Sequence, residues 1–388
     1  MFREHPRGLM TLFFTEMWER FSYYGMRGIL ILFMTATVAN GGYGMDTETA
    51  SAIYGLYTAM VYLVALPGGW IADNILGQRQ AVFLGGIIIA AGHFSMAIPT
   101  KFTFFMGMIL IIIGTGLLKP NVSAIVGDLY PQEAGAKRDA GFSIFYMGIN
   151  LGALFGPMVC GFLGEKIDWH LGFSAAGVGM VLGLIQYKYG WKFLENAGLL
   201  RGKTEDQVGQ AKRQLFLGIG VVVAIVLLLT LAHNFQVIHI TLTGVAHATG
   251  VIISGLAILY FIYVLLVDGA IRKQLEPIEM KRIFVIFLLF VGAALFWSGF
   301  EQAGSSMNLF AERLTDRVVF GFEAPASWFQ SVNPLFIILL APVFGSLWVA
   351  LDRAGKEPSI PAKFGLGLLQ LGVAFLVLAW GSSFASET

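Results

Sequence analysis

The chain has 388 residues, of which 56% are hydrophobic and only 13% are charged, and its mean hydropathy is +0.73. Soluble domains average about 25% charged residues, so this composition indicates a membrane protein. The formal net charge of +1 gives no indication of nucleic-acid binding, and the single Cys160 excludes both an intrachain disulfide and a cysteine-rich metal site.

Eleven apolar segments are candidate membrane spans, because a span needs about 20 predominantly apolar residues. They are residues 10–36, 51–72, 80–98, 102–126, 141–163, 170–188, 214–232, 245–267, 283–303, 328–350 and 363–384. With the N-terminus inside, the cytoplasmic segments hold 18 of the 25 Lys and Arg residues and the outer segments hold 4. Positive charge favours the cytoplasmic side. We therefore predict a multi-pass protein of the cell (inner) membrane with a cytoplasmic N-terminus.

The spacing of the spans predicts an all-α, two-bundle organisation. Residues 1–188 form an N-terminal six-helix bundle, and 189–213 form a long polar cytoplasmic linker. Residues 214–267 carry almost no charge within their two spans, which favours a two-helix insert, expected as a hairpin outside the pathway. Residues 268–388 then begin a C-terminal bundle with three spans. A six-plus-six architecture needs three more, so we expect a C-terminally incomplete chain.

The first span carries charged and aromatic polar residues on a single face. At about 100° per residue, one side of the helix presents Glu16, Glu19, Arg20, Tyr23, Tyr24 and Arg27. Charges at bilayer depth are costly and normally face a water-filled cavity or a partner. This stripe therefore predicts a helix that lines an aqueous pathway.

Each of these charges has more than one interpretation. Glu16 and Arg20 are four residues apart and could simply neutralise one another, but intramembrane carboxylates also serve proton relays. Lys119, near the inner end of the fourth span, could extend its ammonium to the interface. Arg27 has no such route, because the span continues apolar beyond it. Two cations facing one cavity would hold a carboxylate.

The later spans add three polar candidates. Glu301 in the ninth span is either an acid at the outer interface or a salt-bridge partner that reaches across the cavity to Arg27. Burying the polar side chains of Asn150 and Asn333 in lipid costs free energy, so both should face protein or water. They either join helices, with Asn333-Pro334 at a kink, or bind substrate.

Several motifs point to one family. The segment 69–79 resembles the cytoplasmic loop signature of the major facilitator superfamily, through Gly69, Asp73, Gly77 and Arg79. Residues 16–25 (EMWERFSYYG) resemble the ExxERFxYYG motif of the proton-dependent oligopeptide transporter (POT/PTR) family. Residues 145–154 resemble that family's second signature, and 357–364 look like a further family segment. The two extra helices match the insert of its prokaryotic members.

The resemblance implies a proton-coupled symporter that imports di- and tripeptides by alternating access. Protons would be the coupling ion, with no other cofactor, and a monomer in the lipid bilayer would suffice. The resemblance assigns proton coupling to Glu16, Glu19, Arg20 and Glu301. Substrate binding falls to Arg27, Tyr24, Tyr62, Lys119, Asn150, Trp297 and Asn333, although core packing remains an alternative for Tyr62. The resemblance also implies that an acidic residue associated with the peptide amino terminus lies in the three absent spans.

Two rival functions are weighed against this one. A transporter of the same fold could carry nitrate or another small anion, but an anion needs no partner for an amino terminus. A membrane-integral enzyme would need a nucleophile–base pair or metal ligands, and no such constellation is found. None of the six histidines forms a metal-ligand spacing on one helix, and the glycine-rich stretches do not open a nucleotide site.

Overall fold

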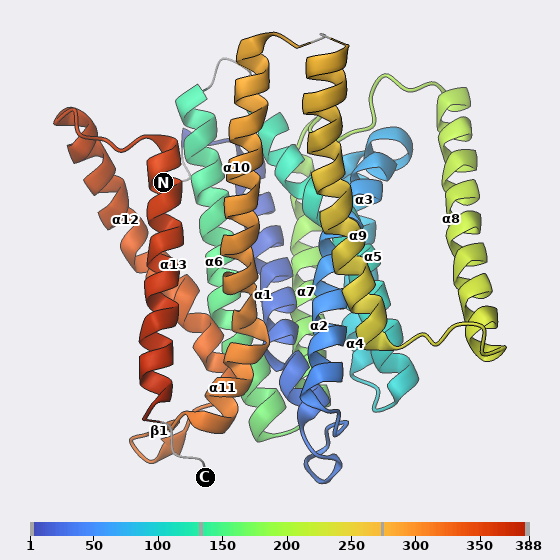
Figure 1. Cartoon of the computed structure of the whole chain (residues 1–388), viewed down its shortest axis with the longest axis vertical. Helices are drawn as coiled ribbons and strands as arrows, with labels where there is room; N and C mark the ends of the chain where they lie inside the picture. The colour runs from blue at the N-terminus through green and yellow to red at the C-terminus, as the bar shows by residue number, and fades with distance from the viewer. Residues whose placement is uncertain (1–3, 132–134, 273–274, 385–388) are drawn as a thin grey trace.

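The computed structural model describes residues 4–131, 135–272 and 275–384, and these are almost entirely helical (Figure 1). The first half contains α1 (Arg7–Thr35), α2 (Thr47–Leu63), α3 (Ala65–Ile71), α4 (Gln78–Met96), α5 (Lys101–Asp128), α6 (Gly135–Lys166) and α7 (Trp169–Gly190). A π-helical turn (Ala72–Leu76) extends α3, and two 3-10 turns follow α1 (Val38–Asn40) and α7 (Trp191–Phe193).

The second half begins with α8 (Glu205–Asn234) and α9 (Leu242–Ile262), the latter extended by a π-helical segment (Tyr263–Ile271). It continues with α10 (Pro277–Phe300), the 3-10 turn η6 (Glu301–Gly304), α11 (Ser306–Leu314), strands β1 (Val318–Val319) and β2 (Phe322–Glu323), the 3-10 turn η7 (Ala326–Ser331), α12 (Val332–Arg353) and α13 (Ile360–Ser382). The two strands pair antiparallel as a short hairpin.

Each of the eleven predicted spans coincides with one long helical segment. Nine segments of the described chain are long and apolar enough to cross a membrane, and α1 and α4 account for the other two. α1 is less apolar because its charges lie within the helix rather than at its ends. The end at which α1 begins is called the inner end below, following the predicted orientation, and it is uppermost in Figure 1.

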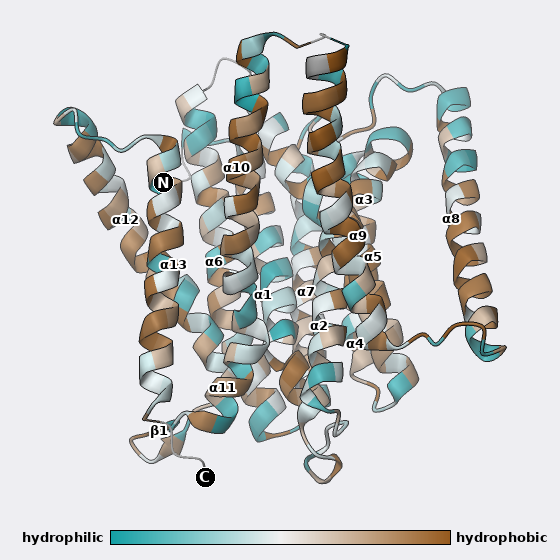
Figure 2. Ribbon diagram, in the orientation of Figure 1, coloured by the Kyte–Doolittle hydropathy of each residue, from teal (hydrophilic) through white to brown (hydrophobic). Residues whose placement is uncertain are grey.

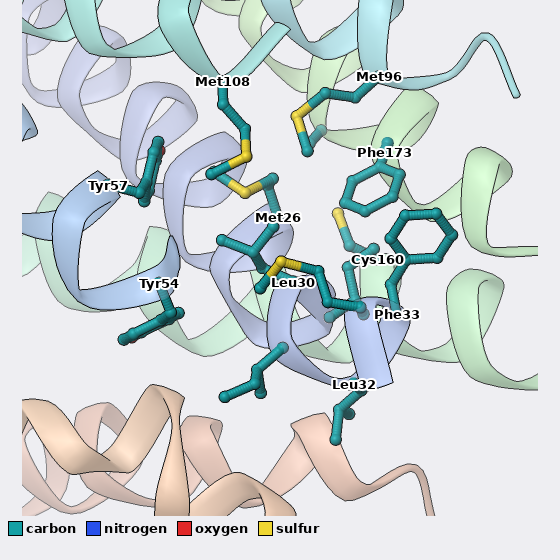
Figure 3. Packing of buried hydrophobic residues seen from close by; sticks show 14 of the residues in the cluster. Met26, Leu30, Leu32, Phe33, Tyr54, Tyr57, Met96, Met108, Cys160 and Phe173 are labelled. Atoms are coloured by element: carbon teal, nitrogen blue, oxygen red, sulfur yellow. The ribbon is translucent and has the colours of Figure 1, made fainter. Parts of the chain in front are cut away.

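α1 is the centre of the first half and packs against both α6 and α7, while α4 packs along α5. Glycines permit these close approaches. A Cβ atom on Gly152 of α6 would lie 2.3 Å from the carbonyl oxygen of Met17, so the two backbones meet directly. Around them, the buried cluster in Figure 3 joins α1 to α2, α5 and α7, and the thiol of Cys160 is fully buried in it.

The two helices of the predicted insert do not form a packed hairpin. α8 stands apart from the other helices and presents an apolar surface along most of its length, whereas α9 packs against α2 (Figures 1 and 2). The linker is also shorter than predicted, because residues 205–213 are the first turns of α8. Thr204 and Gln207 start that helix with a reciprocal capping box.

Candidate functional site

The acidic part of the α1 stripe is buried and paired within the helix. Glu16, Glu19 and Arg20 are 3%, 1% and 3% exposed. Arg20 donates from Nη2 to Oε1 of Glu19 at 2.6 Å and from Nε to Oε2 of the same carboxylate. Its Nε lies 3.3 Å from Oε1 of Glu16, whose other oxygen has no hydrogen-bond partner among the described residues. One guanidinium therefore serves two carboxylates, which leaves one negative charge unbalanced within the triad.

Arg27 joins the two halves of the protein. Its side chain is buried on α1, and Nη2 lies 2.6 Å from Oε2 of Glu301, at the start of the turn η6. Nη2 also donates to the backbone carbonyl of Glu301 at 3.3 Å, while Nε donates to the hydroxyl of Tyr54 on α2. The ion pair between Arg27 and Glu301, predicted as one of two readings, is present and spans 274 positions in sequence.

A break in the ninth span brings Glu301 to this position. α10 ends at Phe300, and a 3-10 turn from Glu301 to Gly304 leads into α11. A Cβ atom on Gly304 would lie 1.9 Å from the hydroxyl oxygen of Tyr54 and 2.7 Å from Nε of Arg27. The turn can approach the guanidinium so closely because Gly304 has no side chain.

Beside this ion pair lies a cavity of about 710 Å³ between α2 and α10. Its walls include the predicted residues Tyr62, Trp297 and Glu301. Lys119 on α5 places Nζ 4.1 Å from the centre of the Tyr62 ring, a cation–π contact. Lys119 also interacts electrostatically with Glu16, Glu19 and Glu301. The cavity walls are mainly apolar, and Glu301 is the one charged residue among the described residues that line them. Small-molecule sites usually combine apolar walls with a small number of polar groups.

Tyr24 connects the two cationic centres of α1. Its ring centre lies 5.8 Å from the guanidinium carbon of Arg20 and also 5.8 Å from that of Arg27. The structure thus links three carboxylates, three cations and three aromatic side chains through contacts or through a shared cavity wall. These are Glu16, Glu19, Glu301, Arg20, Arg27, Lys119, Tyr24, Tyr62 and Trp297. Tyr62, Trp297 and Glu301 among them line the cavity.

The two predicted asparagines lie outside this group of contacts. Asn150 is buried on α6 and donates from Nδ2 to the carbonyl of Tyr146 at 2.9 Å, within its own helix. Asn333 is exposed near the start of α12. Within the described residues, neither side chain makes a polar contact with the charged cluster. Polar identity and the family resemblance predicted both as binding residues, and neither specifies which face of a helix meets the cavity in this structure.

Tyr54 was missed at the sequence level although a signal for it exists. Tyr54, Thr58 and Tyr62 follow one another at intervals of four residues, which places all three on one face of α2. All three line the cavity. This spacing predicts that Tyr54 lies on the same face as Tyr62, whereas only the tertiary structure gives its hydrogen bond with Arg27.

The loop motif forms an anchoring site at the inner end. Gly77 adopts a φ of +78°, which a glycine readily takes. Arg79 donates from Nη2 to the carbonyls of Glu195 and Ala197 at 2.7 Å each, and so fixes the segment that follows α7. Asp73 is exposed, and Gly69 lies in α3. The described residues hold no cluster of three or more metal-ligating side chains.

A helical membrane protein in which a buried ion pair joins two halves beside a cavity has the architecture of a transporter. The comparisons with known proteins identify its family. The model of the POT family matches residues 79–388. The chain is 43% identical to the peptide transporter YePEPT of Yersinia enterocolitica over 389 residues, covering 97% of this chain and 74% of that protein. It is 38% identical to the di-/tripeptide transporter of Lactococcus lactis subsp. cremoris, covering 96% and 75%.

Solved structures of POT transporters also resemble this chain. A peptide transporter POT in complex with sulfate superposes with a TM-score of 0.87 at 44% identity, over 98% of this chain and 75% of that one. A POT family transporter in complex with 5-aminolevulinic acid gives a TM-score of 0.86 at 38% identity, over 97% and 77%. The chain belongs to the POT family, and its fold is that of the major facilitator superfamily.

Proposed function

We propose that this protein is a proton-coupled transporter of di- and tripeptides, carried in the cell membrane with its N-terminus in the cytoplasm. The observation that carries the proposal is the ion pair of Arg27 with Glu301 at the wall of the cavity. A peptide presents a carboxylate at one end, and a buried guanidinium is the group best suited to bind it through two parallel hydrogen bonds.

In the described arrangement, Glu301 competes with any substrate for this guanidinium. Protonating Glu301 removes the charge that attracts Arg27, and Arg27 can then turn to a peptide carboxylate. Conversely, a carboxylate bound to Arg27 leaves Glu301 without its counter-charge and favours its protonation. Each ligand lowers the free-energy cost of binding the other, and this reciprocal coupling is what a symporter requires.

The triad on α1 supplies a second place for a proton. Glu16 keeps one carboxylate oxygen unpaired, and Arg20 balances only one of the two acids. Lys119 interacts electrostatically with both acids and contacts the ring of Tyr62, which lines the cavity. A proton on Glu16 or Glu19 would weaken their hold on Lys119, and its ammonium could then join Arg27 in binding the peptide carboxylate.

The cavity walls are compatible with peptides of varied sequence. Tyr62 and Trp297 offer flat apolar surfaces. The charged Glu301 of the same wall pairs with Arg27, and Lys119 contacts the Tyr62 ring. Such a site fixes the common backbone charge by ion pairing and accepts different side chains by non-directional contact. Tyr24, Asn150 and Asn333 remain part of the proposed binding set. The first contacts Arg27, and the two asparagines lie on α6 and α12, which pack together.

The test is uptake of a labelled tripeptide into proteoliposomes that contain the purified protein. We expect accumulation that depends on an inward proton gradient, is inhibited by unlabelled dipeptides and is unaffected by excess nitrate. Gradient-driven accumulation that nitrate blocks and dipeptides do not would favour the small-anion alternative. Uptake that is equal with and without the gradient would contradict proton coupling.

A further inference from the structure

A second set of contacts between the two halves runs from the middle of α6 to its outer end. Here the 3-10 turn η7 packs against α6. Four residues of α6 face this turn at intervals of four, three and four positions, so they share one side of the helix. They are Leu154, Met158, Gly161 and Glu165.

Glu165 makes the densest contacts of this set. Its Oε2 accepts a hydrogen bond from the backbone N–H of Ala326 at 2.7 Å. Its Oε1 accepts from the N–H of Ser327 at 2.9 Å and from Oγ of Ser327 at 2.5 Å. The turn has no side-chain cap of its own, since Pro325 precedes it. A carboxylate from the other half of the protein therefore supplies the cap, where negative charge is favoured.

The remaining contacts follow the same face inward. Trp328 donates from Nε1 to the carbonyl of Met158 at 3.0 Å, and Ser331 donates from Oγ to the carbonyl of Leu154 at 2.7 Å. α6 and η7 touch directly at Gly161, because a Cβ atom on this residue would lie 1.9 Å from Oγ of Ser327. Ser327 is fully buried by this contact.

The polar contacts between residues 7–193 and 277–384, as far as these are described, lie between the middle of α6 and the outer loops. They begin at Leu154, include the ion pair of Arg27, and reach the outer loops, where Lys166 contacts Glu323 and Arg313 contacts Thr47. Among the residues that the structure describes, no side-chain hydrogen bond or ion pair joins the inner halves of α1 and α6 to α10, α12 or α13. The structure therefore represents a state in which the outer ends are joined.

We propose that Glu165 is a positioning residue that holds the outer side closed, and that opening this side to the exterior requires its carboxylate to release Ala326 and Ser327. The proposal depends on the alternating-access part of the proposed function but on no particular substrate. When the outer side opens, water replaces the three hydrogen bonds. Glu165 therefore shifts the equilibrium between the state with the outer side closed and the state with it open, and it does not block the conversion between them.

The experiment measures the separation of the two outer ends in the full-length protein by double electron–electron resonance. Spin labels are attached to Val38→Cys, in the turn after α1, and Val318→Cys, in the hairpin, since both positions are exposed. The native Cys160 is fully buried and should remain unlabelled, which the parent chain checks. Wild-type protein should show a short distance and a minor longer one.

Glu165→Ala should raise the ratio of long to short distances by about tenfold, equivalent to about 1.4 kcal/mol. Ser327→Ala should shift it in the same direction by a smaller factor. The matched control is Glu323→Ala, which removes another carboxylate at the outer end. Glu323 has two ion-pair partners, Lys166 and Arg317, and its own side chain is 53% exposed. Exposed pairs contribute little, so its ratio should change by less than about threefold.

Transport supplies a second readout. If the outward-facing state becomes more populated, the KM for labelled tripeptide outside the vesicle should fall in Glu165→Ala, because apparent affinity scales with the population of the competent state. A purely structural defect would lower the amount of active protein and leave KM unchanged. Should Glu165→Ala fail to give monodisperse protein, Glu165→Gln serves instead, since its amide retains an acceptor but places a donor against the N–H of Ala326.

The proposal is overturned if the Glu165 variant keeps the wild-type distance ratio and KM, or if Glu323→Ala shifts the ratio equally. A single short distance in wild type and every variant would also overturn it. Failure of the proposed substrate is distinguishable, because it would abolish tripeptide uptake in the wild type while leaving the distance measurement intact.

Discussion

Replacing Arg27 tests the central assignment most directly. The side chain donates hydrogen bonds to the Tyr54 hydroxyl and, at 3.3 Å, to the Glu301 carbonyl, and its Nη2 lies 2.6 Å from the Glu301 carboxylate as an ion pair. Nε and Nη2 reach these acceptors from different positions on one rigid plane. In Arg27→Lys, a single ammonium cannot occupy both positions. We therefore expect this conservative change to impair peptide binding even though the charge is kept.

The size of the expected loss in peptide affinity follows from the burial of the Arg27 and Glu301 side chains. Removing one partner of a buried, hydrogen-bonded charge pair costs about 2–5 kcal/mol. The Arg27 side chain is 5% exposed, but that of Glu301 is 23% exposed, so water screens part of the interaction. We take the lower limit of about 2 kcal/mol, which corresponds to roughly a thirtyfold loss of affinity at 1.4 kcal/mol per factor of ten.

The assay compares a tripeptide with its C-terminally amidated form. Affinities are measured by competition against a labelled peptide in wild-type protein, Arg27→Lys and Arg27→Ala. Wild type should bind the amide poorly, and Arg27→Ala should discriminate little between acid and amide. If Arg27→Ala retains the full preference for the free acid, Arg27 is a gating or structural residue, and Lys119 alone holds the carboxylate.

Four further predictions use other features. Glu19→Gln should retain peptide exchange in proteoliposomes but lose gradient-driven accumulation, because an amide cannot titrate; wild-type accumulation would contradict its role in coupling. Tyr54→Phe removes an acceptor from a charged donor and should weaken peptide binding by about 1.5 kcal/mol, whereas an unchanged Kd would show that the hydroxyl does not position Arg27. The two cations beside Glu323 lower the pKa of its carboxyl, so its ion pairs stabilise the fold above the ordinary carboxyl pKa and are lost as pH falls through the lowered value. The small difference in Tm between wild type and Glu323→Gln at pH 7 should therefore vanish near pH 2, and a constant difference would contradict this. Gly152→Ala should lower Tm, since overpacking at a helix contact costs about 1–3 kcal/mol, and an unchanged Tm would mean that α1 and α6 separate freely.

The sequence was sufficient to predict the helical architecture. Apolar segments of bilayer length mark each long helix, because the bilayer requires the backbone to satisfy its hydrogen bonds within the segment. The helical period then places Glu16, Glu19, Arg20 and Arg27 on one face of α1 without reference to any other helix. These are local properties, so one segment at a time determines them. The linker boundary was misplaced because the capping box of Thr204 starts α8 inside a polar stretch.

Partner choice was decided only by the tertiary structure. From the sequence, Glu301 was either an acid at the outer interface or the ion-pair partner of Arg27, and the break at residues 301–304 is what brings it within 2.6 Å of that guanidinium. Tyr54 and Glu165 gain their importance from contacts with residues in other helices, and no local pattern specifies those contacts. Periodicity determines the face on which a residue lies. The packing of helices far apart in the chain determines what that face meets.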